Sequence, residues 1–404
     1  MNVSFWIARR YFSSRKKTSF VSLISNISML GVGVGTMALV VVLSVFNGLE
    51  DMNRQIFKSA DADIKISLNE GKRFELSTSK LQAIKNTQGV KIVTEVIEEN
   101  VLARYGDQQT VVRLKGVDSS FLDRHQLDGA MIEGKLRLFA DNEAKAIIGA
   151  LVQYRLRLTP EDVLTPLELW YPRKAKTLNL NSPAAFNQQY VRVSGVYSLE
   201  DRLDDFVIVP LNFASQLLEY DKQRTALEIQ IDPQSNVSNI KEALQTQVGR
   251  AFKVQTRDEQ NANLLRAIQI EKLFVTIALG LIMLVAAINI FFSLTMLVLD
   301  KQDDVKMLLA MGGTRQLVKR IFLFEGAIVA FTGASVGLVL GILLCWLQSH
   351  YGFVTMQLNS AISNAYPVQM QWHDFVVTGL IVVSITITVS YIPASRAAQT
   401  PETR

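Results

Sequence analysis

Four long apolar runs constrain this chain more than any other feature of its sequence. Glu325 is the only charged residue within the runs, which cover residues 18–49, 273–299, 321–347 and 375–395. A helix needs roughly 20 apolar residues to cross the hydrocarbon core of a bilayer, and shorter runs of about 10–14 are typical of buried helices in soluble proteins. The first run is too long for a signal peptide and lacks an Ala-x-Ala cleavage site. The sequence therefore predicts an α-helical membrane protein with transmembrane helices at 20–49, 270–299, 321–347 and 374–395.

The distribution of Lys and Arg around the runs predicts their orientation. Basic residues gather before the first run, between the second and third, and after the fourth, whereas residues 348–372 contain none. Because cytosolic loops are enriched in Lys and Arg, both termini are expected in the cytosol. The cytosolic segments would be 1–19, 300–320 and 396–404, and the outer segments 50–269 and 348–373. This bias also accounts for the net charge of +5, so no nucleic-acid partner is expected.

The N-terminal segment 1–19 mixes aromatic and basic side chains. Phe5, Ala8, Tyr11 and Phe12 can share one face of a helix while the arginines stay in water. This pattern fits an amphipathic helix lying on the anionic inner leaflet. It fits equally well a simple basic flank that sets topology.

The outer segment 50–269 is large enough to form its own core and has a mixed pattern. Alternating or β-branched runs predict strands at 60–67, 90–105, 108–118 and 225–232. Residues 77–87 and 237–248 are typical of helices that begin near Ser or Asn. A polar excursion, 173–189, separates two further strand candidates, 167–171 and 190–197. Loops of this length are usually functional or disordered.

The sequence lacks several nucleotide-binding and metal-binding motifs, and a glycine-rich stretch that resembles one has a structural explanation. The sequence holds no Gly-x-x-x-x-Gly-Lys-Ser/Thr loop for ATP phosphates, and its three histidines lack ligand neighbours at metal-binding spacing. Cys345 is the only cysteine, so no intramolecular disulfide is possible. The "GVGVGT" stretch lies inside an apolar run, where Gly31 and Gly35 favour close helix packing over nucleotide binding. We expect no catalytic, cofactor or metal site in this chain.

The stretch "DVKMLLAMGGTRQLVKR" connects the second and third runs. Val305, Leu308 and Leu309 share a helical face with Gly312, and the glycine pair is expected to end that helix. Thr314 is placed to cap the next helix. The stretch is either a stiff cytosolic helix suited to mechanical coupling or an ordinary loop between spans.

Residues 271–344, which contain this stretch, resemble the permease module shared by FtsX, MacB and the lipoprotein-releasing permeases. The closing "YIPASRAAQTP" resembles the same superfamily, and "FWIARRYFSSRKK" with "GVGVGTMALVVVLSVFNGLEDMNRQIF" resembles the lipoprotein-releasing (Lol) branch. The resemblance implies a type VII ABC transporter permease with four spans. A large mixed α/β (α+β) periplasmic domain would lie between helices one and two. Its membrane-proximal part would be 50–105 with 236–269, and its inserted part 106–235.

The resemblance also implies a function and partners. In this branch, ATP hydrolysis by a separate ATPase dimer moves triacylated lipoproteins from the outer leaflet of the inner membrane to a soluble periplasmic chaperone. ATP and Mg²⁺ would be bound by that ATPase, and a second permease subunit, identical or paralogous, would complete the pore. Two alternatives stay open: a MacB-like efflux permease with a separate ATPase, and an FtsX-like transmitter that activates a cell-wall hydrolase.

Three groups of candidate site residues follow from the patterns together with the resemblance. The ATPase-coupling group is Val305, Leu308, Leu309, Met311 and Gly312. The substrate-path group lies in the outer halves of spans one and two, where the alternative is plain contact with membrane lipid: Met37, Val41, Val45, Phe46, Ile268, Leu273, Phe274 and Ile277. The chaperone-binding group lies in the excursion 173–189, where the alternative is a disordered loop: Arg173, Lys174, Lys176, Pro183 and Phe186.

Overall fold

The structure is a computed structural model that describes residues 3–13, 20–140, 143–160, 165–173, 185–199, 204–355 and 365–398. The chain divides into two compact units. The helical unit comprises residues 1–52, 266–357 and 364–404, and the sheet unit comprises 53–265 and 358–363. Among the described residues, four helices are long and apolar enough to cross a membrane. Each predicted span lies on one of them.

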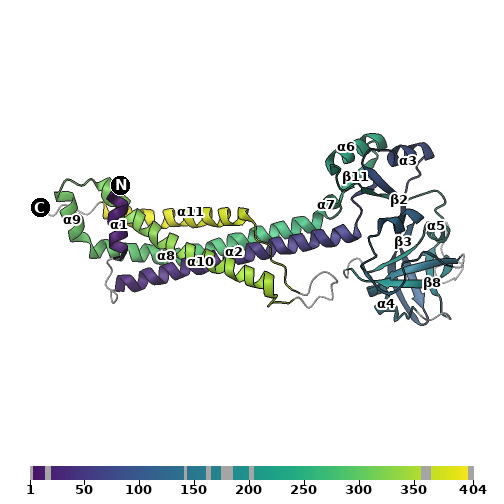
Figure 1. Ribbon diagram of the computed structural model, residues 1–404, viewed down its shortest axis with the longest axis horizontal. Coiled ribbons are helices and arrows are strands. Elements are labelled where there is room, and N and C mark those ends of the chain that lie inside the picture. The colour runs from purple at the N-terminus through teal and green to yellow at the C-terminus, as the bar shows by residue number, and fades with distance from the viewer. Residues whose placement is uncertain are drawn as a thin grey trace. The chain divides into compact units, whose positions relative to one another are not determined.

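The helical unit is built from long helices, with shorter helices near one end of them (Figure 1). The long helices extend beyond the predicted spans. The first two extend into the segment 50–269, because no glycine or proline interrupts the polar residues that follow 49 or precede 270. The helix bounds are α1 Val3–Ser13, α2 Phe20–Ala60, α8 Ala262–Asp300, α9 Gln302–Ala310, α10 Arg315–Tyr351 and α11 Trp372–Ala397. The part of α2 up to Met52 and the part of α8 from Arg266 onward belong to the helical unit.

Small residues bring α2 close to two other helices. A Cβ placed on Gly31 would lie 3.1 Å from the Cβ of Ala286 on α8. On the other side, a Cβ on Gly33 would lie 3.0 Å from the carbonyl oxygen of Gly333, and one on Gly337 would overlap the backbone of Gly33. Only glycine permits this backbone contact between α2 and α10. The predicted role of the "GVGVG" stretch in close helix packing is confirmed.

The described part of the sheet unit contains one mixed sheet of eleven strands. Its main order is β11-β1-β10-β2-β3-β9-β6-β8-β4, with parallel pairing in β3/β9 and β6/β8. The strand bounds are β1 Ile64–Leu68, β2 Val90–Tyr105, β3 Gln108–Val117, β4 Met131–Gly134, β5 Phe139–Ala140, β6 Glu143–Gly149, β7 Leu167–Pro172, β8 Phe186–Tyr197, β9 Phe206–Pro210, β10 Ala226–Ile231 and β11 Phe252–Thr256. The helices are α3 Thr78–Lys85, η1 Ser119–Arg124, α4 Ala150–Leu156, α5 Leu211–Leu218, α6 Val237–Val248 and α7 Arg257–Gln260.

Two apolar cores divide the sheet unit, and β2 contributes to both. The first core joins β1, β10, β11 and the start of β2 with α3 and α6. The second joins the rest of β2 with β3, β6 to β9, α4 and α5. The second core begins at Ile97, before the predicted boundary at 106, and Leu227 belongs to the first core although it falls in the predicted insert. Because one continuous strand serves both cores, the division falls within β2 rather than after it.

Candidate functional sites

The connection between α9 and α10 has the predicted form. Gly312 follows the end of α9 with φ +92°, and the Gly313 N–H donates to the carbonyl of Leu308 at 2.9 Å. The Thr314 hydroxyl accepts from the Leu317 N–H at 3.2 Å and so caps α10. Both local predictions, the glycine stop and the threonine cap, are confirmed. The two helices are therefore joined by a short connection of defined geometry rather than by a long loop.

The apolar face of α9 is only partly available to another protein. Val305 is buried in a cluster with Val318 and Phe322 of α10, and Leu308 and Leu309 pack at its edge. Met311 is 80% exposed, and Gly312 is also exposed. Met307, which the sequence analysis did not single out, is 59% exposed. Val305 thus packs α9 against α10. Met307 on α9 and Met311 at its end are large apolar side chains that remain exposed.

Helix α1 packs beside the same region. The ring of Phe5 meets that of Phe324 edge to face at 5.9 Å, and Ala8 is fully buried. Burial and the neighbouring carboxylate of Asp304 raise the pKa of Tyr11 to about 12. The Lys301 ammonium lies 5.9 Å from the centre of the Tyr11 ring. The N-terminal helix therefore contacts both α10 and the beginning of α9.

A polar cluster joins three of the long helices. Lys272 on α8 donates to the Asn47 side-chain oxygen on α2 at 2.6 Å. The Asn47 amide donates to Asp374 on α11, whose other carboxylate oxygen lies 3.6 Å from the Lys272 ammonium. Asn47 and Asp374 are buried. We call Asn47, Lys272 and Asp374 the polar cluster. It was not predicted, although Lys272 and Asp374 stand at the very edges of apolar runs.

The segment before α11 is seated against the same part of α2. The Gln369 N–H donates to the carbonyl of Ser44 at 2.9 Å, and its carbonyl accepts from the Asn47 side chain at 3.3 Å. Gly48 lets the backbone at Pro367 approach, because a Cβ on Gly48 would overlap it. We call residues 365–371 the strap. The strap and the polar cluster together fix α2 against α8 and α11.

The predicted substrate-path residues lie on either side of the polar cluster in sequence. On α2, the four candidates are half-buried: Met37, Val41, Val45 and Phe46. On α8, Ile268 is half-buried, whereas three candidates are more than half exposed: Leu273, Phe274 and Ile277. The exposed set is therefore concentrated on α8, beside Lys272.

The base of the excursion is an antiparallel hairpin. β7 pairs with β8 from Leu167↔Val191 to Pro172↔Phe186, so β8 begins earlier than predicted and the connection spans 173–185. Arg173 donates to the Asn187 side chain at 2.7 Å, and Asn187 donates to Glu219 at 2.9 Å. The half-buried Phe186 ring lies 6.0 Å from Trp170. Lys174, Lys176 and Pro183 lie outside the described residues.

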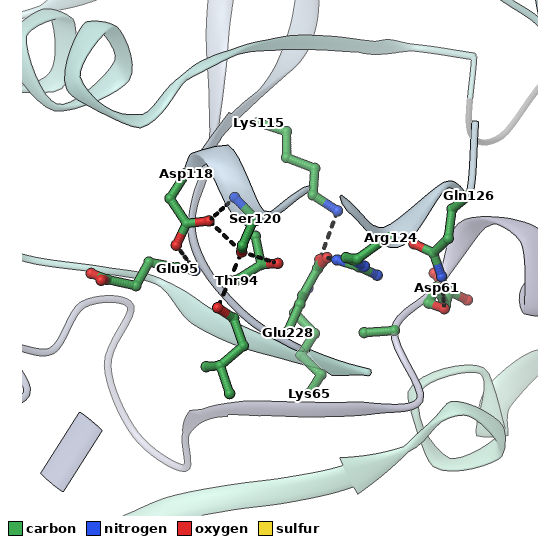
Figure 2. Close-up of polar contacts among 12 residues, drawn as sticks. Asp61, Lys65, Thr94, Glu95, Lys115, Asp118, Ser120, Arg124, Gln126 and Glu228 are labelled. Carbon is green, nitrogen blue, oxygen red and sulfur yellow. Dashed lines mark hydrogen bonds and ion pairs between the residues drawn. The ribbon is translucent and has the colours of Figure 1, made fainter. Parts of the chain in front are cut away.

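The polar face of the sheet carries a buried network of charges (Figure 2). Glu228 on β10 accepts from Lys115 on β3 at 2.6 Å and from Arg124 on η1 at 2.5 Å. Lys65 on β1 donates to Glu98 on β2 at 3.1 Å. Burial alone would raise the pKa of Glu228, but Lys115 and Arg124 outweigh it and hold that pKa well below its usual range. Burial lowers the pKa of Lys65, but the neighbouring carboxylates, Glu98 first and then Glu228, together more than offset this and leave the pKa raised.

Beside this network lies a polar cavity of about 340 Å³. It is lined by residues of both signs, among them Lys65, Glu98 and Lys115, and by the amide side chain of Asn261. Asn261 donates to Asp61 at 2.6 Å, which ties the residue before α8 to the residue after α2. Across the described ranges, no group of three His, Cys, Asp or Glu side chains is placed to hold a metal ion.

Comparison with known families accounts for both units. A family model described as MacB-like periplasmic core domain matches residues 25–247, more than half of the chain. The chain belongs to this family. A second model, described as FtsX-like permease C-terminal, matches residues 276–401 and thus the last three long helices. This member of the MacB-like core domain family is a membrane protein with four apolar helices and a periplasmic domain built on a mixed sheet.

Relatives with curated names align along most of this MacB-like chain. The lipoprotein-releasing system transmembrane protein LolE of Haemophilus influenzae is 25% identical over 99% of this chain and 98% of its own length. The corresponding LolC of Neisseria meningitidis serogroup B is 27% identical, over 84% of this chain and 81% of its own. Among solved structures, the periplasmic region of MacB from Actinobacillus actinomycetemcomitans gives a TM-score of 0.37 at 12% identity, over 52% of this chain and 95% of that one.

Proposed function

We propose that this chain is the permease subunit of an ABC transporter in the bacterial inner membrane. It extracts lipoproteins from the outer leaflet of that membrane, using ATP hydrolysis in a separate subunit, and transfers them to a soluble periplasmic chaperone. The observation that carries this proposal is the alignment with LolE, which extends over nearly the whole of both chains. Extraction needs an energy source, because burial stabilises an acyl chain by about 0.8 kcal/mol per CH₂.

In this transporter, each part of the chain faces one side of the membrane and contacts a particular partner. The sheet unit is inserted between the first and second spans and stands in the periplasm, and both termini are cytosolic. A dimer of the ATPase docks at α9 and binds ATP and Mg²⁺, while this chain carries no catalytic residue of its own. A second permease subunit, identical or paralogous, completes the transporter.

Helix α9 supports the coupling role. Force from a moving ATPase is transmitted best by an element that is fixed to the spans at one face and exposed at another. Val305 provides the fixed face, and Met307 and Met311 provide the exposed one. We propose that the ATPase contacts the segment 305–312, including Leu308, Leu309 and Gly312.

The lipoprotein's acyl chains are proposed to pass along the outer halves of α2 and α8. This assignment rests on the exposed apolar side chains beside Lys272. A photocrosslinker at Phe274 is expected to capture lipoprotein in membranes. Leu380 on α11 provides a matched control, since it is also apolar and 62% exposed. Equal capture at both positions would mean that Phe274 merely faces lipid.

The connection 173–185 is proposed to recruit the chaperone. Its base is rigid, because the hairpin pairing continues to Pro172 and Phe186 and the Arg173–Asn187–Glu219 contacts brace it. A braced base lowers the ordering cost of binding. Replacing 174–184 by a short Gly-Ser turn is expected to block transfer to the chaperone while ATPase activity is kept. Undiminished transfer would show that this connection does not recruit the chaperone.

Depletion of the chain in living cells tests the function as a whole. We expect triacylated lipoproteins to accumulate in the inner membrane when the chain is depleted. An efflux permease would instead raise drug or peptide sensitivity, and an FtsX-like transmitter would produce a cell-wall defect, in both cases with lipoproteins correctly sorted. Normal sorting after depletion would therefore refute the proposal.

A further inference from the structure

The polar cluster is unusual because its members come from three separate helices and meet at the ends of apolar runs. Asn47 bridges the other two: its oxygen accepts from Lys272, and its amide donates to Asp374. Lys272 and Asp374 also form an ion pair at 3.6 Å, longer than a hydrogen bond. One amide thus stands between a cation and its counterion, and holds α2 to both α8 and α11.

This arrangement has an obvious second state. If α2 moves away, Asn47 leaves, and Lys272 can close the remaining gap to Asp374 and hydrogen-bond it directly. Neither state leaves the ammonium or the carboxylate without a partner, which is the condition for a low-cost change where Asn47 and Asp374 are buried. Elements with two packed arrangements of this kind are what conformational switches use.

The position of the cluster connects this exchange with transport. Asn47 directly follows Phe46 on α2, and Lys272 directly precedes Leu273 on α8. The Asn47–Lys272 hydrogen bond therefore fixes the spacing of the two helices at the residues proposed to line the acyl-chain path. We call the line between α2 and α8 at these two residues the seam.

We propose that Asn47, Lys272 and Asp374 are positioning residues that keep the seam closed, and that the seam opens when Lys272 exchanges Asn47 for Asp374 and so admits an acylated cargo. This inference rests on the proposed function, which supplies the cargo. The strap adds to the closed state, because its backbone bonds to Ser44 and Asn47 seat the start of α11 on α2. These two bonds also break when α2 moves away from α11.

The first experiment measures the seam without cargo. Spin labels at Val45 and Ile270, in a Cys345→Ala background, report the α2–α8 distance in the full transporter in nanodiscs. Asn47→Ala removes the bridge and leaves the Lys272–Asp374 pair intact. We expect the ratio of long to short distances to rise about tenfold, equivalent to about 1.4 kcal/mol. An unchanged distance distribution would overturn the proposal, whatever the cargo proves to be.

The second experiment adds purified triacylated lipoprotein and measures stimulation of the ATPase. Asn47→Ala should lower the half-saturating lipoprotein concentration about tenfold and leave the maximal rate unchanged, whereas a purely structural role would lower the maximal rate. Lys272→Asp combined with Asp374→Lys should recover the activity that each single change loses. Lys241→Met, which breaks the exposed Lys241–Glu259 pair of the sheet unit, is the control. Failure of wild-type protein to respond to lipoprotein would refute the proposed function but not the seam.

Discussion

Glu228 is the residue whose removal should most weaken the sheet unit. Its side chain is 4% exposed and pairs with both Lys115 and Arg124, whose side chains are 11% and 0% exposed. Glu228→Ala would leave two buried cations without their shared counterion. Nearby carboxylates cannot replace it fully, because Glu98 is 3.8 Å from Lys115 and already pairs with Lys65.

The expected loss follows from the burial of the partners. Breaking a buried ion pair from one side costs about 3–5 kcal/mol, compared with a total stability of about 5–15 kcal/mol for a typical domain. Lys241→Ala is the matched control, because the Lys241–Glu259 pair is equally short at 2.5 Å but its side chains are 30% and 45% exposed. Exposed pairs contribute about 0–1 kcal/mol. The two substitutions should therefore differ by at least about 2 kcal/mol.

Hydrogen–deuterium exchange on the full-length protein in detergent measures this difference locally. Peptides from β3 and β10 should exchange about 100-fold faster or more in Glu228→Ala than in wild type, the factor that 3 kcal/mol implies. The helical unit serves as an internal reference and should be unaffected. A Glu228→Ala effect no larger than that of Lys241→Ala would refute the argument that burial, and not mere proximity, sets the strength of this network.

Three further predictions concern pH, packing and coupling. Because the pKa of Glu228 is held below its unfolded value of about 4.3, its contribution to stability is complete at neutral pH and should be lost as the pH falls below that value, seen as faster β10 exchange. Gly337→Leu should lower the melting temperature in detergent, since overpacking costs about 1–3 kcal/mol, whereas Gly280→Leu, with open space around its Cβ, should not. Leu308→Asp with Leu309→Asp should abolish co-purification of the ATPase with membrane insertion intact, and full recovery of the ATPase would disprove the coupling assignment.

The parts of the fold that the sequence predicted are those determined by local chemistry. Strand β2 spans Val90–Tyr105 as its β-branched pattern predicts. Ser77 and Asn236 cap α3 and α6 through their side chains, as expected of these residue types. Gly312 adopts positive φ for the same local reason. Each of these features depends on a few neighbouring residues.

The parts that escaped prediction depend on residues distant in sequence. Strand β9 is a short apolar run, whose periodicity does not separate strand from buried helix, and β6 has only two large apolar residues, which follow Glu143 and Lys145. The polar cluster joins Asn47 to a residue 225 positions away and to one 327 positions away. Likewise, the exposure of α9 could not be read from its apolar face, because Val318 and Phe322 of the next helix cover Val305. Burial of that kind is decided by tertiary packing.

Helix α2 is held by two kinds of contact that should respond differently to force. Around Gly33 it meets α10 backbone to backbone, where sliding would drive the carbonyl of one helix into the other. Around Asn47 it is held by hydrogen bonds that another partner can replace. A helix fixed rigidly at one level and exchangeably at another can tilt about the rigid contact with little loss of packing. We therefore expect opening of the seam to be a tilt of α2 about Gly33 and Gly337, so that a bulky residue at 337 should impair opening even where the polar cluster is intact.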